Sequence, residues 1–287
     1  STTRRGTDSS RRTTAARIAV LILRDLPWVG SFRSSDDRLN KIWEVGAWTV
    51  HLNMQEHLWD GIHRDRLVWM GDLNPEIRTV AAVFDDTETV ETSLDFVRDR
   101  TPADAWMNTI STYSAWWIIN QYEWHLARGR REYLEAQRGA LLPLLERLHA
   151  IVGPDGSEEF PAMRFLDWPS HHDPIAVHAG LQGLLALALR AGERLCHWLG
   201  ESKTEERCRS TAARVRAHRA EGGMNKQAHA LQVLAGMEDA GEIQHRVLGV
   251  EPERRLSTFL GFYVLQAMAA ASSHETAVDV IKKYWGG

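Results

Sequence analysis

Residues 60–72, DGIHRDRLVWMGD, bring together several side chains that could do chemistry. Three of them are aspartates (Asp60, Asp65 and Asp72), and two arginines, a histidine and a tryptophan accompany them. A half-buried carboxyl group with other carboxyl groups nearby has a raised pKa and can act as a general acid. Two carboxyl groups across a sugar ring are the usual equipment for glycoside hydrolysis. An aspartate–arginine ion-pair lattice that only holds the loop explains the same residues, and the residues alone leave both interpretations open.

The composition narrows the class of protein. The 287 residues carry a net charge of -4, so the chain offers no basic face for nucleic acid. Two cysteines, Cys196 and Cys208, are too few for a disulfide framework and do not form a metal-type CxxC pair. Twelve tryptophans against five tyrosines favour a lined cleft, for which sugar binding is one common reason and a large helical core is the other.

The elements that must position residues 60–72 are helices. From Ser34 onward the apolar residues follow a period of 3.6, and Pro, Gly and Asp mark the breaks. The pattern predicts a strand tail over 16–24 and helices over 36–57, 74–84, 88–100, 109–128, 131–150, 174–199, 204–219, 224–236, 240–247, 257–271 and 275–284. Asp72 could help to cap the second helix. No repeat of solenoid type is visible, and a closed ring of helical hairpins fits this count.

The order of the motifs resembles that of a known family, the α-L-rhamnosidases of glycoside hydrolase family seventy-eight. The stretch 60–72 resembles their signature loop, in which an Asp, an Arg-acidic pair, a Trp and a Gly-Asp recur in this order. The resemblance extends over about residues 17–287 and includes GSFRSSDDRLNKIWEVG at 30–46, SLDFVRDRTP at 93–102, STYSAWW at 111–117, RFLDWPS at 164–170, HAGLQGLLALAL at 178–189, LSTFLGFYVLQAM at 256–268 and the closing AVDVIKKYWGG. It implies an all-α (α/α)6 barrel over 31–287, preceded over 1–30 by a leader and the end of a β-sandwich.

The resemblance also implies an activity and the residues that perform it. The chain is expected to release terminal α-L-rhamnosyl residues with inversion, and Asp65 occupies the position of the general acid. Asp60 and Asp72 match the other two acidic positions, which are expected to bind sugar hydroxyls and to tune the acid. The positions expected to line the sugar pocket are Arg64, Trp69, Trp117, Asp167 and Trp168.

The sequence departs from the family's pattern in two places. The loop is one residue shorter than in many members and has Asp65 where glutamate is usual, so the carboxyl reaches about 1.5 Å less. The family's general base is a glutamate beyond the YWGG-like element, so we expect the base and the last barrel helix to lie beyond Gly287. A barrel without that helix would expose apolar flanks, which predicts self-association.

Other interpretations remain beside the rhamnosidase. The chain could bind rhamnose without turnover, or be a helical-barrel hydrolase or lyase for another deoxy or uronic sugar. The cluster of His171, His172 and Asp173 is not expected to hold a metal, because adjacent histidines in a Pro-bounded loop cannot both turn inward easily. We expect no cofactor. No run of eighteen apolar residues suggests a membrane span, and the lack of a clear signal peptide favours the cytoplasm.

Overall fold

The computed structural model describes residues 20–63, 65–85 and 88–286, and helices dominate these ranges. The α-helices are α1 (Asp37–Asn53), α2 (Leu73–Val83), α3 (Glu88–Arg100), α4 (Ser111–Arg128), α5 (Arg131–Ala150), α6 (Pro174–Leu199), α7 (Ser202–Ala217), α8 (Lys226–Leu234), α9 (Ala240–Ile243), α10 (Gly261–Ala270) and α11 (His274–Val280). Three further helical segments are η1 (Met107–Thr109), η2 (Gln244–Leu248) and η3 (Ile281–Trp285).

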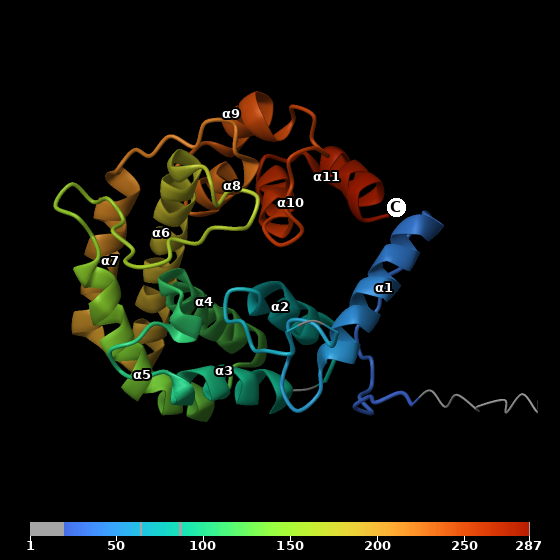
Figure 1. Ribbon diagram of the computed structural model, residues 1–287, viewed down its shortest axis with the longest axis horizontal. Coiled ribbons are helices and arrows are strands. Elements are labelled where there is room, and N and C mark those ends of the chain that lie inside the picture. Colours follow the sequence, from blue (N-terminus) through green and yellow to red (C-terminus); the bar gives the residue numbers. More distant parts are fainter. Residues whose placement is uncertain (1–19, 64, 86–87, 287) are drawn as a thin grey trace, which may run out of the picture.

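The helices form a ring of hairpins (Figure 1). Helices α2, α4, α6, α8 and α10 pack against one another in this order along the inside, and α1, α3, α5, α7, α9 and α11 lie around them. The two ends of the ring meet where η3 contacts α1: Arg38 Nε donates to the Gly286 carbonyl over 3.1 Å, and Lys282 Nζ lies 3.4 Å from Asp36 Oδ2. The predicted all-α, six-hairpin class of fold is confirmed.

Helix α6 shows why the sequence forms these elements. Asp173 caps it by accepting a hydrogen bond from the Ala176 amide over 3.0 Å, and Pro174 occupies the first turn, where its missing N–H costs nothing. Gly200, with a φ of 75°, ends it in the left-handed conformation. The helix is long and apolar enough to cross a membrane, but 78% of its most apolar window is buried inside this barrel, as expected of a core helix.

Local interactions correct several predicted boundaries. Helix α1 ends at Asn53 because residues 54–58 turn tightly, with Met54 and Leu58 paired in an isolated antiparallel bridge. Asp72 precedes α2 but forms no side-chain capping bond. The strand predicted over 16–24 is not confirmed: residues 20–24 have no regular structure, since no neighbouring strand pairs with them, and residues 16–19 lie outside the described ranges.

Candidate active site

The loops that lead from an outer to an inner helix gather at one end of the ring, because the helices alternate in direction. Hydrogen bonds tie each of these loops to the next. Asn108 bonds both Met70 N and Val68 O at 3.0 Å, Thr112 donates to Phe165 O at 2.9 Å, and Asn225 donates to Ser170 Oγ at 2.8 Å. The predicted site residues of the loop over 54–72, hereafter the acid loop, therefore lie in a connected belt of loops.

Asp60 holds the acid loop closed. Its carboxylate Oδ1 accepts from the Leu67 amide at 2.9 Å, and its own amide donates to the Leu67 carbonyl at 3.0 Å. Asp60 and Leu67 are thus paired at the two ends of the segment between them. Arg66 within it has a φ of 53°, a conformation that residues other than glycine seldom adopt.

Asp65 and Trp69 lie together, as the motif predicts. The Trp69 indole Nε1 donates to Asp65 Oδ2 over 3.3 Å, and the Asp65 side chain is exposed on the loop. This bond orients the carboxyl group while leaving it accessible to a ligand. Arg64, the third residue predicted here, lies outside the described residues.

Glu76 belongs to the site although sequence reasoning missed it. It lies on the first turn of α2, and its Oε2 is buried without a hydrogen-bond partner. Burial raises the pKa of the Glu76 carboxyl well above its usual range, and the charges of Asp72 and Asp60 raise it further. Burial and the same two aspartates also raise the pKa of the Tyr113 phenol. The spacing of four residues from Asp72 to Glu76, which puts both on one helix face, is the signal that could have found it.

A row of aromatic rings leads away from the acid loop. Trp69 meets Tyr113 edge-on with ring centroids 6.0 Å apart, Tyr113 meets Phe165 at 6.1 Å, and Phe165 meets Trp168 at 5.0 Å. Trp168 is 65% exposed. The row links Trp69 to Trp168, two residues that the sequence predicted for one pocket but that lie 99 positions apart.

Asp167, which precedes Trp168 of this row, is buried, and one of its two carboxylate oxygens accepts a hydrogen bond. Its Oδ1 accepts from the Ser170 amide at 2.9 Å, whereas its Oδ2 is buried without a hydrogen-bond partner. A buried carboxylate oxygen without a partner is costly, which is typical of groups reserved for a ligand.

Trp117 does not lie with these residues. It is fully buried, and its indole donates to the Leu94 carbonyl of α3 over 3.3 Å, so it faces the outer layer. Its neighbour Trp116 faces the inside instead, with its ring 5.2 Å from that of Tyr263 on α10. The helical spacing allows at most one of the two tryptophans in the pocket, and the sequence prediction selects Trp117. The structure instead turns Trp117 towards α3 and Trp116 towards α10.

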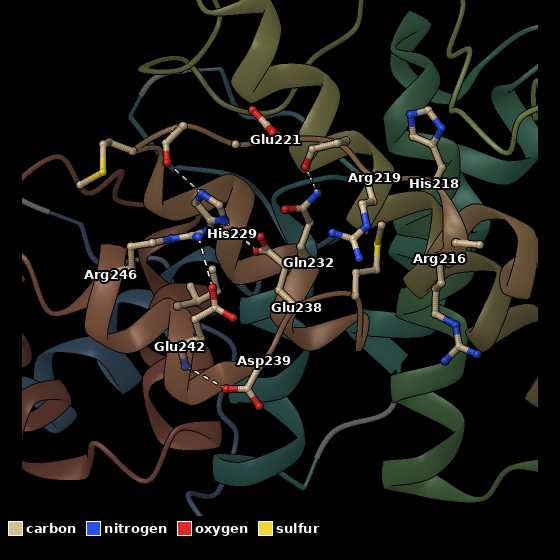
Figure 2. A pocket seen from close by; sticks show the side chains of 17 residues that line it. Arg216, His218, Arg219, Glu221, His229, Gln232, Glu238, Asp239, Glu242 and Arg246 are labelled. Carbon is tan, nitrogen blue, oxygen red and sulfur yellow. Dashed lines mark hydrogen bonds and ion pairs between the residues drawn. The ribbon is translucent and has the colours of Figure 1, made fainter.

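A cavity of about 820 Å³ lies elsewhere, between the end of α7, α8 and α9 (Figure 2). Two pairs of opposite charge lie in its wall: His229 Nδ1 lies 2.6 Å from Glu238 Oε2, and Arg246 Nη1 lies 3.2 Å from Glu242 Oε1. Sequence reasoning assigned no role to this cavity. Among the described residues, no group of three or more His, Cys, Asp or Glu could hold a metal ion.

Comparison with known sequences shows which proteins the segment containing the acid loop is similar to. Residues 27–128 match the family described as the bacterial α-L-rhamnosidase six-hairpin glycosidase domain. An α-L-rhamnosidase of Formosa agariphila is 39% identical over 54 residues, which cover 19% of this chain and 6% of that protein. The predicted resemblance to α-L-rhamnosidases is confirmed.

Solved structures agree on the fold. A family seventy-eight rhamnosidase of Bacillus sp. GL1 has a TM-score of 0.75 at 21% identity, covering 92% of this chain and 31% of that one. A rhamnosidase of Klebsiella oxytoca solved with rhamnose has a TM-score of 0.75 at 18% identity, covering 91% and 56%. An α-L-rhamnosidase of Streptomyces avermitilis complexed with L-rhamnose has a TM-score of 0.73 at 16% identity, covering 91% and 28%. The chain thus spans between 28% and 56% of these three proteins and has their helical domain fold.

Proposed function

We propose that this chain is the catalytic domain of a glycoside hydrolase that releases terminal α-L-rhamnosyl residues with inversion. The observation that carries the proposal is the convergence of Asp60, Asp65, Asp72 and Glu76 with an aromatic row at one end of the barrel. The structures of the Klebsiella and Streptomyces rhamnosidases, solved with rhamnose, support a rhamnoside as the substrate.

In this proposal Asp65 is the general acid. The Trp69 indole donates to Oδ2 and orients the carboxyl group, which passes a proton to the glycosidic oxygen as the bond to the sugar breaks. Inversion requires a second carboxylate, about 6.5–9.5 Å away, that activates a water molecule on the opposite face of the ring. Asp60 and Asp72 hold sugar hydroxyls, and the rings of Trp69 and Trp168 exclude water from the sugar face.

Glu76 has a supporting part in the same proposal. Because its pKa is raised, the carboxyl is protonated over a range in which ordinary glutamates are ionised. A neutral carboxyl group can donate a hydrogen bond as well as accept one, so in this proposal Glu76 can donate to a sugar hydroxyl.

The test is hydrolysis of an aryl α-L-rhamnoside by this chain and by a version extended beyond Gly287, which includes the region where the general base is expected. Asp65→Asn and the matched control Asp104→Asn, whose side chain lies in an exposed loop, are measured in both forms. We expect Asp65→Asn to lower the rate by about 10²–10⁴-fold, the usual contribution of general acid catalysis, and the control to be unchanged. The first product detected by NMR should be β-L-rhamnose.

Calorimetric titration with L-rhamnose, L-fucose and D-galacturonate separates the alternatives. Binding of L-rhamnose without turnover would show a binding domain, and turnover of another glycoside would show a different sugar specificity. Failure to bind or cleave any of these sugars would refute the proposal.

A further inference from the structure

Two histidines from different helices face each other outside the acid loop. His178 lies on the second turn of α6, and His218 directly follows α7. Their Nε2 atoms are 3.4 Å apart, and the rings meet edge-on at an angle of 83°. The side chains keep 32% and 18% of their surface exposed, so the space beside the two nitrogens is open to solvent.

Each ring is backed by a carboxylate on its other nitrogen. His178 Nδ1 lies 2.7 Å from Glu158 Oε1, and His218 Nδ1 lies 3.4 Å from Asp155 Oδ2. Arg164 Nη2 also lies 3.4 Å from His178 Nδ1, which is farther than the Glu158 carboxylate. The Arg164 guanidinium forms an ion pair with Glu158. The carboxylates accept hydrogen bonds only, so they favour the tautomers in which both Nδ1 atoms carry the proton.

These tautomers leave two lone pairs directed at one another. In a neutral imidazole protonated on Nδ1, Nε2 is an acceptor, so His178 and His218 repel each other unless a cation lies between them. Zn–N bonds of about 2.0–2.1 Å at a tetrahedral angle put two ligand nitrogens about 3.3–3.4 Å apart, which is the separation seen here. Metal-bound histidines also commonly donate their second N–H to a carboxylate.

The pair is held rigidly by neighbouring contacts. The buried Gln182 of α6 accepts from the Glu158 amide at 2.7 Å and donates to Gly156 O and Val215 O, both at 2.8 Å. Gln182 therefore joins the loop that carries both carboxylates to α6 and α7. Ser157 donates two hydrogen bonds to Asp155 Oδ1, from its amide at 3.0 Å and from its hydroxyl at 2.6 Å, which hold that carboxylate in place.

We propose that His178 and His218 form a binding site for a divalent first-row transition metal ion, with Glu158 and Asp155 as outer-shell carboxylates and solvent completing the coordination. The site is of the open kind, since two protein ligands cannot fill a tetrahedral shell. Copper(II) binds more tightly than zinc, as nitrogen ligands generally dictate. The inference is independent of the proposed hydrolase activity.

The test is a calorimetric titration of the chelator-treated, untagged chain with Zn²⁺. We expect one saturable equivalent, with affinity lowered at least about tenfold in His178→Ala and in His218→Ala. The double variant His171→Ala/His172→Ala, which removes an exposed histidine pair from another loop, is the matched control and should retain full affinity. Saturable binding that persists unchanged in both single variants would refute the site.

A second pair of measurements decides the case if a histidine variant fails to fold. Asp155→Asn changes a side chain that is 64% exposed, so the Tm should hold while zinc affinity falls about tenfold through the lost outer-shell contact. Electron paramagnetic resonance of the wild type with one equivalent of Cu²⁺ should show hyperfine coupling to two imidazole nitrogens. A spectrum without nitrogen coupling, or no saturable binding of Zn²⁺, would mean that the histidines share a proton only.

Discussion

Carboxyl groups beside the acid loop and in the cavity between α7 and α9 have different charged neighbours. Next to the acid loop, burial raises the pKa of Glu76 on α2, and the charges of Asp72 and Asp60 raise it further. In the cavity, acids lie beside bases, as Glu238 does beside His229 and Glu242 beside Arg246 (Figure 2). Paired opposite charges stabilise a structure, whereas gathered like charges destabilise it and are typical of a site.

The largest expected effect comes from opening the acid loop. Asp60→Ala removes the acceptor for the Leu67 amide, so the loop loses its closing hydrogen bond and Asp65 moves. We expect kcat/KM on an aryl α-L-rhamnoside to fall about 10²-fold, as for a misplacement near 1 Å. Asp60→Asn removes the charge but keeps a hydrogen-bond acceptor for the Leu67 amide. Comparing it with Asp60→Ala separates the effect of losing this hydrogen bond from the effect of losing the charge.

Asp239→Ala is the variant of the cavity that corresponds to Asp60→Ala. Asp239 caps α9, since its Oδ1 accepts a hydrogen bond from the Glu242 amide at 2.8 Å. This variant should leave kcat/KM within about twofold, because the cavity takes no part in hydrolysis. Equal losses in the two regions would abolish the distinction between them.

Gly71→Ala tests the packing behind the acid loop. A Cβ at Gly71 would lie 2.3 Å from Tyr113 Cε1, so the aromatic row beginning at Trp69 would have to shift. We expect unfolding in urea to show a loss of about 1–3 kcal/mol, as for other overpacked sites. Gly61→Ala in the same loop is the control, since no atom lies within 4 Å of its added Cβ and it should be neutral.

Glu238→Gln tests whether the cavity's charges stabilise the fold. Burial lowers the pKa of His229, but the hydrogen bond and charge of Glu238 and the Gly223 carbonyl raise it, with a net rise above 6.5. The stabilisation is therefore fully present below pH 6.5 and is lost as the pH rises through the raised pKa. We expect the variant to lose about 1.5 kcal/mol at pH 5.5 and less at pH 8.5, measured by urea unfolding. Glu242→Gln, an exposed pair partner, should change little at either pH.

Glu76→Gln is expected to have the smallest effect of these variants. In contrast to Glu238→Gln, it should raise the stability, and it should do so only at high pH. The pKa of Glu76 is raised above its unfolded value of 4.5. At a pH where the carboxyl group is protonated in both the folded and the unfolded state, folding therefore buries no charge at this position. The wild type loses stability as the pH rises above 4.5, because the unfolded state ionises first. The Tm of Glu76→Gln should therefore match the wild type at pH 4 and exceed it by a few degrees at pH 8, while the exposed Glu132→Gln should follow the wild type throughout. A Tm difference that does not change with pH would place Glu76 in an ordinary, solvated environment.

Much of the fold could be predicted from the sequence because its signals are local. The caps and stops of α6 are single residues, Asp173, Pro174 and Gly200, whose effect does not depend on distant neighbours. The end of α1 could not be predicted in this way, since a tight turn over residues 54–58 decides it. Residues 20–24, the described part of the strand expected over 16–24, have no regular structure.

The sequence by itself determined the composition of the acid loop, with Asp60, Asp65, Asp72 and Trp69 within thirteen residues, and the helical periodicity that builds the ring. Only the tertiary structure decided that Trp116 rather than Trp117 faces inward, because the helix rotation is set by packing against α3 and α10. It also buried Glu76 beside the two aspartates and brought His178 within 3.4 Å of His218 across 40 positions. Burial and long-range contacts arise from packing of the whole ring, and no local pattern encodes them.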